Sequence, residues 1–346
     1  MTTLLLSGLA VTAAACASLT AAVIPLLRRA RVVDVPGDRS LHRTPVPRGG
    51  GLAIVLAASL ATWTAVLAAV HLQGAVHAMS GVDVALMGLA TVLAFALLGL
   101  IEDLFSVSVR ARLVLQLVLG AGLGLVAHSA FEVSLWWTPA ICVGTAALVN
   151  ATNFMDGANG LACGHALLTS LWYVQVAAVA PVAGLGLVMV SVAGACLGFL
   201  PFNTPRAKVF LGDSGSYALG SAWAFAVTAC LSRGVAVEAA LAPVLVLLAD
   251  TGYTLWMRLR AGQCWYAPHR LHVYQRLVCA GWPHWASALL VTLAAASCSA
   301  LAASSLLTSN RLWMPQVAMA AVLIVYLKMP SIIGAPNPFP TLRRAR

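Results

Sequence analysis

The sequence predicts an all-α, polytopic membrane protein, and three observations support this fold class. Of 346 residues, 61% are hydrophobic and only 9% are charged, whereas soluble domains carry about 25% charged residues. The apolar residues form long runs, each near the roughly 20 residues with which a helix crosses the hydrocarbon core. The basic residues, which give a net charge of +10, concentrate between these runs. We therefore expect one integral membrane domain over residues 1–330 and a cytoplasmic basic tail over 331–346.

The length leaves room for about ten spans with short loops, and the apolar runs themselves predict eleven. The first, residues 3–27, is followed by Arg28, Arg29 and Arg31. A signal peptide carries its positive charge before the apolar run, so we expect a retained helix with a periplasmic N-terminus. The other predicted spans are 50–71, 83–101, 111–128, 132–150, 160–180, 182–201, 216–232, 235–256, 283–305 and 312–329.

The positions of the charges agree with this arrangement. With the N-terminus outside, the inner segments hold all of the 20 Lys and Arg except Arg233 and Arg311. The same parity places the acidic candidates described below on the cytoplasmic side. These inner segments are 28–49, 102–112, 150–159, 202–215, 257–282 and 328–346.

Two classes of function are disfavoured. The basic residues lie in short loops without interleaved aromatic residues, so we expect no nucleic-acid partner. The 8 Cys are scattered, mostly within apolar runs, and form no C-x-x-C pair. We expect them to be small apolar side chains, with neither a disulfide nor a zinc site.

Residues 150–164 form a polar stretch between two strongly apolar runs. They place the Asp156 carboxylate among the amides of Asn150, Asn153 and Asn159. Polar side chains at the edge of a membrane span cost free energy unless they are paired, solvated or bound to a ligand. The stretch is therefore a candidate site.

Two further inner loops carry carboxylates. Glu102 and Asp103 are adjacent at the end of a predicted helix, and Arg112 follows. Neighbouring acids repel each other unless a cation is close, and Mg²⁺ prefers such oxygen ligands. Asp213 lies between glycines that allow a tight turn, and the nearby Asn203 can donate to phosphate oxygens. The alternatives are a solvated acidic helix end and an ordinary glycine-rich loop.

The first and last inner loops supply cationic side chains. Arg39, His42 and Arg48 alternate with Pro and Gly, a combination that can hold cations against a phosphate; binding of lipid head groups also explains it. His269 and His272 share a helical face and could bind metal or diphosphate, although an amphipathic surface patch is the simpler reading of such a pair alone.

Three further polar residues lie within or near the ends of predicted spans. Asp250 lies inside an apolar run, and we expect it to pair with an arginine or with the polar network of the site. His284 lies near a span end and is interpreted as interfacial. His165 follows the central stretch and could orient it, but a structural role is favoured.

In this order, the motifs resemble those of the polyprenyl-phosphate N-acetylhexosaminyl-1-phosphate transferase superfamily, glycosyltransferase family 4. The resemblance runs from residue 34 to residue 276. The matching residues are Glu102 and Asp103 (paired aspartates), Asn153 and Asp156 (N-x-x-N-x-x-D-G), Asp213 (G-D-x-G-S), and His269 and His272 (histidine-rich loop).

The resemblance implies a reaction in the bacterial cytoplasmic (inner) membrane. A UDP-N-acetylhexosamine gives its sugar 1-phosphate to undecaprenyl phosphate and UMP is released. The resemblance also implies that Asp213 binds Mg²⁺, with Mn²⁺ as an alternative. A homodimer is compatible with it. The implied catalytic residues are Glu102, Asp103, Asp156, His269 and His272. The implied substrate-binding residues are Asn150, Asn153, Asn159, Asn203, Arg39, His42, Arg48, Arg112 and Arg276.

The chain departs from the family pattern at three places. Glu102 replaces the first aspartate of the pair, which alters its reach by one methylene. Asn159 replaces the usual second acid of D-G-x-D-G, which removes any role that needs a charge there. The histidine loop reads H-R-L-H-x-Y-Q-R, which resembles the branch that initiates O-antigen and capsule chains more than the peptidoglycan enzyme.

A membrane carrier or flippase is the alternative from another class. Carriers tend to place intramembrane polar groups near the bilayer midplane, often in paired halves. Here the polar groups cluster at one face and no internal repeat is evident, which favours the transferase.

Overall fold

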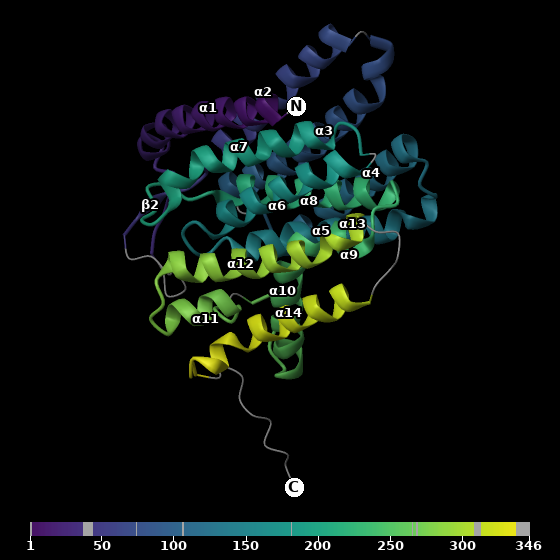
Figure 1. The fold of residues 1–346 in the computed structure, drawn as a ribbon. Coiled ribbons are helices and arrows are strands. Elements are labelled where there is room, and N and C mark those ends of the chain that lie inside the picture. Colours follow the sequence, from purple (N-terminus) through teal and green to yellow (C-terminus); the bar gives the residue numbers. More distant parts are fainter. Residues whose placement is uncertain are drawn as a thin grey trace.

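The computed structural model describes residues 2–36, 44–73, 75–105, 107–180, 182–264, 266–267, 269–307 and 313–336. Within these ranges nearly all regular structure is helical, in agreement with the predicted all-α class (Figure 1). The N-terminal half contains α1 (Thr2–Arg29), α2 (Gly51–Gln73), α3 (Ala75–Phe105), α4 (Val109–Phe131), the 3₁₀ turn η1 (Leu135–Trp137), α5 (Thr138–Met155) and α6 (Leu161–Val179).

The C-terminal half continues with helices of more varied length. It contains α7 (Leu185–Asn203), α8 (Gly212–Ser232), α9 (Val237–Leu241), the 3₁₀ turn η2 (Ala242–Val244), α10 (Leu245–Arg260), α11 (Val273–Cys279), α12 (His284–Ala302), α13 (Ser304–Leu307) and α14 (Met314–Ile332). The predicted span 235–256 is thus divided into α9, η2 and α10. Pro243 lies within η2, and proline interrupts a helix because it lacks a backbone donor.

Every predicted span coincides with helix, and the described residues include 9 helices that are long and apolar enough to cross a membrane. The chain is therefore a multi-pass membrane protein. The helices α5 and α8 are not among these 9. Since α8 is buried along almost its whole length, it needs no apolar face toward lipid and tolerates Asp and Ser. The number of crossings and the side of the N-terminus stay predictions.

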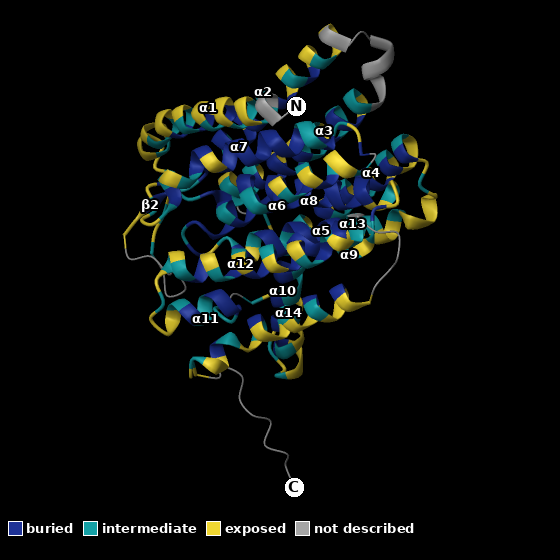
Figure 2. Cartoon of the chain, viewed as in Figure 1, coloured by how far each residue is buried: buried dark blue, intermediate teal, exposed yellow. Residues whose placement is uncertain are grey.

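The helix α8 is the centre of the bundle, packed mainly against α3 and α5. Figure 2 shows the buried residues concentrated in the middle of the bundle, while α1 and α14 expose much of their surface. The helix α10 runs steeply across α12 and α14 (Figure 1) and contacts both.

Glycines allow the helices to approach closely where α8 begins. A Cβ on Gly51 at the start of α2 would lie 2.3 Å from Gly215 Cα, and one on Gly99 of α3 would lie 2.2 Å from Asp213 O. Because no side chain separates these backbones, the ends of α2, α3 and α8 meet in one place.

A short antiparallel pair of strands extends this junction. Strand β1 (Val33–Asp34) pairs with β2 (Val46–Pro47), with Asp34 opposite Val46. Arg48, the next residue, forms an isolated parallel bridge with Phe210. The loop between α1 and α2 is thereby attached to the segment that leads into α8.

Candidate functional site

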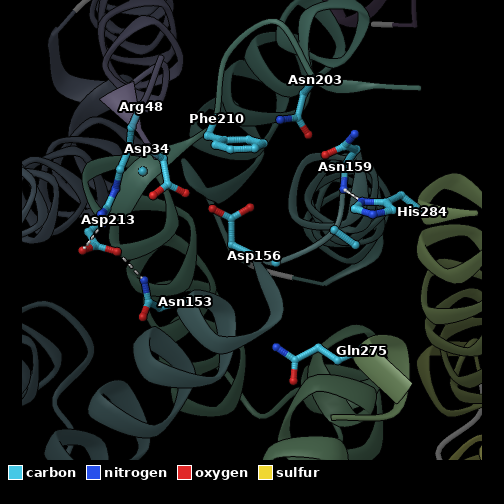
Figure 3. Close-up of a pocket in the computed structure, with 13 residues that line it drawn as sticks. Asp34, Arg48, Asn153, Asp156, Asn159, Asn203, Phe210, Asp213, Gln275 and His284 are labelled. Atoms are coloured by element: carbon cyan, nitrogen blue, oxygen red, sulfur yellow. Dashed lines mark hydrogen bonds and ion pairs between the residues drawn. The ribbon is translucent and has the colours of Figure 1, made fainter. Parts of the chain in front are cut away.

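A cavity of about 340 Å³ lies where the ends of several helices meet (Figure 3). Its walls come from β1, the residue after β2, the loop after α5, the segment between α7 and α8, and the starts of α8, α11 and α12. The lining residues are Asp34, Arg48, Asn153, Asp156, Gly157, Ala158, Asn159, Asn203, Phe210, Gly212, Asp213, Gln275 and His284. Segments far apart in the sequence, which were predicted as separate inner loops, therefore share one pocket.

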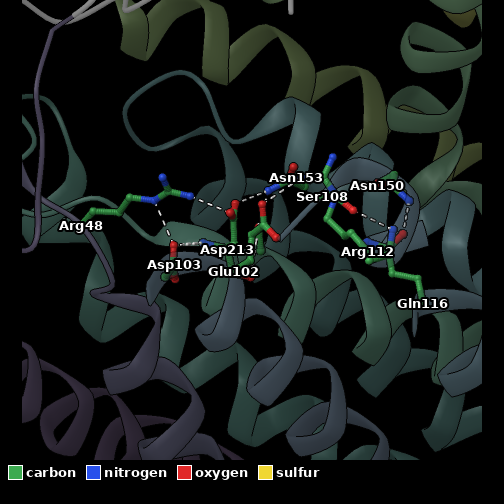
Figure 4. Close-up of polar contacts among 11 residues, drawn as sticks. Arg48, Glu102, Asp103, Ser108, Arg112, Gln116, Asn150, Asn153 and Asp213 are labelled. Atoms are coloured by element: carbon green, nitrogen blue, oxygen red, sulfur yellow. Dashed lines mark hydrogen bonds and ion pairs between the residues drawn. The ribbon is translucent and has the colours of Figure 1, made fainter. Parts of the chain in front are cut away.

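Arg48 and Asp213 form the charged end of this pocket (Figure 4). Arg48 Nη2 lies 2.6 Å from Asp213 Oδ2, and Arg48 Nε lies 2.9 Å from Asp103 Oδ1. The other oxygen of Asp213, Oδ1, accepts a hydrogen bond of 2.7 Å from Asn153 Nδ2. Burial lowers the pKa of Arg48, but Asp213, Asp103 and Asp34 outweigh it and raise the pKa overall. The guanidinium is therefore a permanent cation in the pocket.

Asp103 holds the beginning of α8. Its carboxylate accepts hydrogen bonds of 2.9 Å from the backbone N–H groups of Asp213 and Ser214, and its side chain is only 2% exposed. These N–H groups have no hydrogen-bond partner within the helix, so the carboxylate provides one. Its negative charge also interacts favourably with the positive end of the helix dipole. Asp103 thus fixes the turn from which Asp213 reaches the pocket.

Glu102 lies beside the pocket, in a second polar group, and does not line the pocket. Arg112 Nη1 approaches Glu102 Oε1 at 3.4 Å, while Glu102 Oε2 is buried and has no hydrogen-bond partner in the described part of the chain. Asn150 Nδ2 donates to Gln116 Oε1 and to the carbonyl of Ala146. Figure 4 shows Arg112 and Asn150 on the side of Asp213 that faces away from Arg48.

Asp156 ends α5 and points into the pocket (Figure 3). Its carboxylate has no hydrogen bond or ion pair within the described ranges. Burial and then the neighbouring Asp213 raise the pKa of Asp156 well above the ordinary value, and Arg48 opposes this only in part. An unpaired carboxylate beside a second one is a place where a cation would be stabilised.

The opposite end of the pocket is made by amides and rings. Asn203 Oδ1 accepts from Gly160 N at 2.7 Å, and Asn203 Nδ2 donates to Val209 O at 3.1 Å. Asn159 Nδ2 donates to Pro205 O, and its backbone N–H donates to His284 Nδ1 at 3.2 Å. Since these bonds join the loop after α5 to the loop after α7 and to α12, they shape the pocket as well as line it.

The histidine loop packs behind the pocket. His272 is 3% exposed and its Nδ1 lies 3.1 Å from Asp250 Oδ1; neither it nor His269 lines the cavity. Burial, His272 and Arg258 lower the pKa of His269 to about 4, so its ring is neutral near pH 7. Arg276 Nη2 donates to Pro336 O. Among the described residues of this segment, Gln275 lines the cavity.

Of the remaining interpretations, those of Asp250 and His165 agree with the structure and that of His284 is wrong. Asp250 was expected to pair with an arginine or with a polar network. It contacts His272, and no arginine in the described part of the chain forms an ion pair with it. His284, interpreted as interfacial, lines the pocket. His165 is buried and its Nε2 lies 2.8 Å from Pro243 O, a structural contact between helices. Arg39 and His42 lie outside the described residues.

Sequence reasoning missed the contributions of Asp34, Phe210, Gln275 and His284 to the pocket. Asp34 and Gln275 lie in loops that the sequence had already marked as candidate site segments. Their position in these loops could therefore have indicated that they line the pocket. His284 has no such signal, because the packing of α12 on α6 and on other helices brings its first turn to the pocket.

The fold and the pocket define a polytopic membrane protein whose polar, partly cationic site is built from loop segments at one end of a helical bundle. Residues 84–231 match the family model described as "Glycosyl transferase family 4". The match extends beyond this segment, because a phosphotransferase relative is 31% identical over 78% of this chain and 75% of its own length. The chain therefore belongs to glycosyl transferase family 4, and it is a membrane-embedded transferase.

Similarity to characterised relatives extends beyond that segment. The chain is 31% identical to the decaprenyl-phosphate N-acetylglucosaminephosphotransferase of Mycobacterium leprae, over 78% of this chain and 75% of the relative. It is 27% identical to a probable undecaprenyl-phosphate N-acetylglucosaminyl 1-phosphate transferase of Bacillus subtilis, over 78% and 77%. It is 33% identical to the phospho-N-acetylmuramoyl-pentapeptide-transferase of Desulforudis audaxviator, over 57% and 68%.

Proposed function

We propose that this protein transfers an N-acetylamino-sugar 1-phosphate from a UDP-sugar to undecaprenyl phosphate in the bacterial cytoplasmic membrane, releasing UMP. The product is a sugar-diphospho-undecaprenol that starts a cell-surface glycan of the O-antigen, lipopolysaccharide or capsule type. The observation that carries the proposal is the approach of Arg48 to both Asp103 and Asp213 in a pocket that also contains the unpaired Asp156. The names of the relatives support the same reaction class.

The two ends of the pocket suit the two parts of a nucleotide sugar. Arg48 supplies a cation that can bind diphosphate oxygens. The end with Asn159, Asn203, Gln275, Phe210 and His284 offers hydrogen-bonding groups and an aromatic face, which suit a base and ribose. The donor therefore lies with its diphosphate between Arg48 and Asp156.

The side chains also fit a divalent cation. Within the described ranges there is no group of three or more His, Cys, Asp and Glu in a metal-binding arrangement, but Mg²⁺ needs only one or two carboxylates when substrate phosphates supply other ligands. Asp213 and the unpaired Asp156 provide hard oxygen donors in one pocket. Mg²⁺ held there would neutralise charge on the diphosphate, and Mn²⁺ would suit the same donors.

The reaction proposed is a single displacement. An oxygen of the lipid phosphate attacks the sugar-linked phosphorus, and the bond to the UMP oxygen breaks, so UMP leaves with the electron pair. Of the paired acids, Glu102 has an oxygen without a hydrogen-bond partner, whereas Asp103 is occupied with α8. Glu102 is therefore better suited to accept a proton from the lipid phosphate. Trapping of a sugar-phosphorylated carboxylate in the absence of lipid would contradict this scheme.

The decisive assay uses purified protein, undecaprenyl phosphate and a panel of UDP-N-acetyl sugars, including GlcNAc and deoxy sugars, with and without Mg²⁺. We expect UMP release that depends on both lipid and metal, together with formation of a lipid-linked sugar. No turnover with any sugar of the panel, together with lipid translocation in proteoliposomes, would favour a carrier or flippase instead.

A further inference from the structure

Asp250 joins three helices at the back of the pocket. Its side chain is fully buried in α10, and it accepts hydrogen bonds from Tyr326 Oη of α14 at 2.7 Å and from Val273 N of α11 at 3.0 Å. Thr254 Oγ1 donates to it at 3.2 Å, and His272 Nδ1 lies 3.1 Å away. A buried carboxylate is tolerated when its oxygens are satisfied in this way. The arrangement therefore fixes the start of α11 relative to α10 and α14.

The helix α11 in turn contacts the loop that carries Asp156. Tyr274 Oη donates to Phe154 O at 2.9 Å, and a Cβ on Gly157 would lie 2.1 Å from the same hydroxyl oxygen. The ring of His272 lies nearly parallel to the rings of Phe154 and Tyr274, with its centroid 6.0 Å from the first and 6.1 Å from the second. A shift of α11 would therefore move the residues on both sides of Asp156, and Gln275 with them.

We infer that Asp250 and Tyr326 are positioning residues, which hold α11 so that Tyr274 fixes the loop around Asp156 in its reactive geometry. Tyr326 lies in the last described helix, remote in sequence from the pocket, and does not line it. Its hydroxyl acts through Asp250, then through the backbone and ring of residues 272–274, and finally through Phe154 and Gly157. Small displacements of a reacting group reduce turnover strongly because catalysis depends on alignment.

The test compares Tyr326→Phe and Tyr274→Phe with Tyr173→Phe. Tyr173 is an equally buried tyrosine whose hydroxyl donates to Ala240 O at 2.8 Å, so its variant loses a similar interhelical hydrogen bond away from the pocket. We expect kcat to fall about tenfold in Tyr326→Phe and in Tyr274→Phe, with the donor KM changed less than about twofold, and to stay at the wild-type value in Tyr173→Phe. Because both residues act on the same loop, the double variant should be no slower than the slower single variant.

A second measurement does not depend on turnover. Hydrogen exchange of full-length protein in detergent should be faster at residues 154–160 in Tyr326→Phe than in the wild type, and unchanged there in Tyr173→Phe. The kinetic arm rests on the proposed function, and failure of that function would appear as an inactive wild type. Wild-type kcat in Tyr326→Phe, equal losses in Tyr326→Phe and Tyr173→Phe, multiplicative effects in the double variant, or unchanged exchange would overturn the inference.

Discussion

Arg48 Nη2 lies 2.6 Å from Asp213 Oδ2, although 165 residues separate the two in the chain. The same guanidinium contacts Asp103 through Nε at 2.9 Å. One planar cation therefore bridges the carboxylate that holds α8 and the carboxylate that α8 presents to the pocket. This relationship connects the loop between α1 and α2 with the end of α3 and the start of α8.

The first prediction concerns this bridge. A lysine has a single ammonium group and cannot reproduce contacts through two guanidinium nitrogens. We expect Arg48→Lys to reduce kcat/KM by roughly tenfold or more, because both the bridge and the diphosphate contact weaken. The matched control is Arg233→Lys, which changes an arginine packed on the ring of Phe131 at 5.3 Å. Equal kcat/KM in the wild type and Arg48→Lys would contradict the assigned role.

The second prediction concerns Asp213. Asp213→Asn keeps the size of the side chain and removes its charge, so we expect turnover to fall by about three orders of magnitude while membrane insertion is retained. Steady-state kinetics and detergent-extracted yield measure the two effects. Asp83→Asn is the control, since Asp83 is an exposed carboxylate on α3 outside the pocket. Retained activity in Asp213→Asn would exclude Asp213 as a metal ligand.

The third prediction follows from the raised pKa of Asp156, which burial and Asp213 cause. If the ionised form is required, kcat/KM should increase with pH as Asp156 loses its proton, and this limb of the profile should disappear in Asp156→Asn. The effect on stability has the opposite sign. The unfolded carboxyl ionises first, so the folded state binds the additional proton and the free energy of unfolding falls as pH rises through this window. An unchanged acidic limb in Asp156→Asn would assign it to another group.

The fourth prediction concerns His269, whose pKa is lowered from 6.5 to about 4 by burial, His272 and Arg258. Its ring accepts a hydrogen bond from Leu271 N at 3.3 Å, which requires an unprotonated nitrogen. We expect His269→Gln to leave the shape of the activity profile unchanged between about pH 5 and 8.

The same shift affects stability at acid pH. Between pH 6.5 and about 4, the unfolded chain binds the proton more readily, so the wild type loses stability as pH falls. His269→Gln should lose less over this range when both proteins are unfolded by denaturant in detergent. Parallel losses in the two proteins would show that His269 is already protonated when folded.

The fifth prediction tests the contact between α3 and α8. A Cβ on Gly99 would lie 2.2 Å from Asp213 O, whereas one on Gly144 of α5 meets no atom within 4 Å. Gly99→Ala should therefore destabilise the protein by about 1–3 kcal/mol and lower kcat, because α8 must move away. Gly144→Ala should be neutral or stabilising by about 0.5–1 kcal/mol, since alanine favours helix. Thermal unfolding and kinetics of both variants check this.

The amino-acid sequence was sufficient to predict the helical membrane fold and several of the loops that line the pocket. Runs of apolar residues and the location of Lys and Arg are local signals, and they were sufficient to place a helix at every predicted span. Asn153, Asp156 and Asp213 were also identified without the structure, because polar side chains next to apolar runs need a partner or a ligand.

The contacts of each of these residues could not be predicted from the sequence, because they depend on how the helices pack. Asp103 and Asp213 are both acids at helix ends in the sequence, yet one holds the first turn of α8 and the other faces the pocket, since helix packing determines which N–H groups each carboxylate meets. Helix packing also determines the positions of His284 and Tyr326. The helix α12 brings His284 to the pocket, and α14 brings Tyr326 to Asp250. No local sequence pattern predicts either contact.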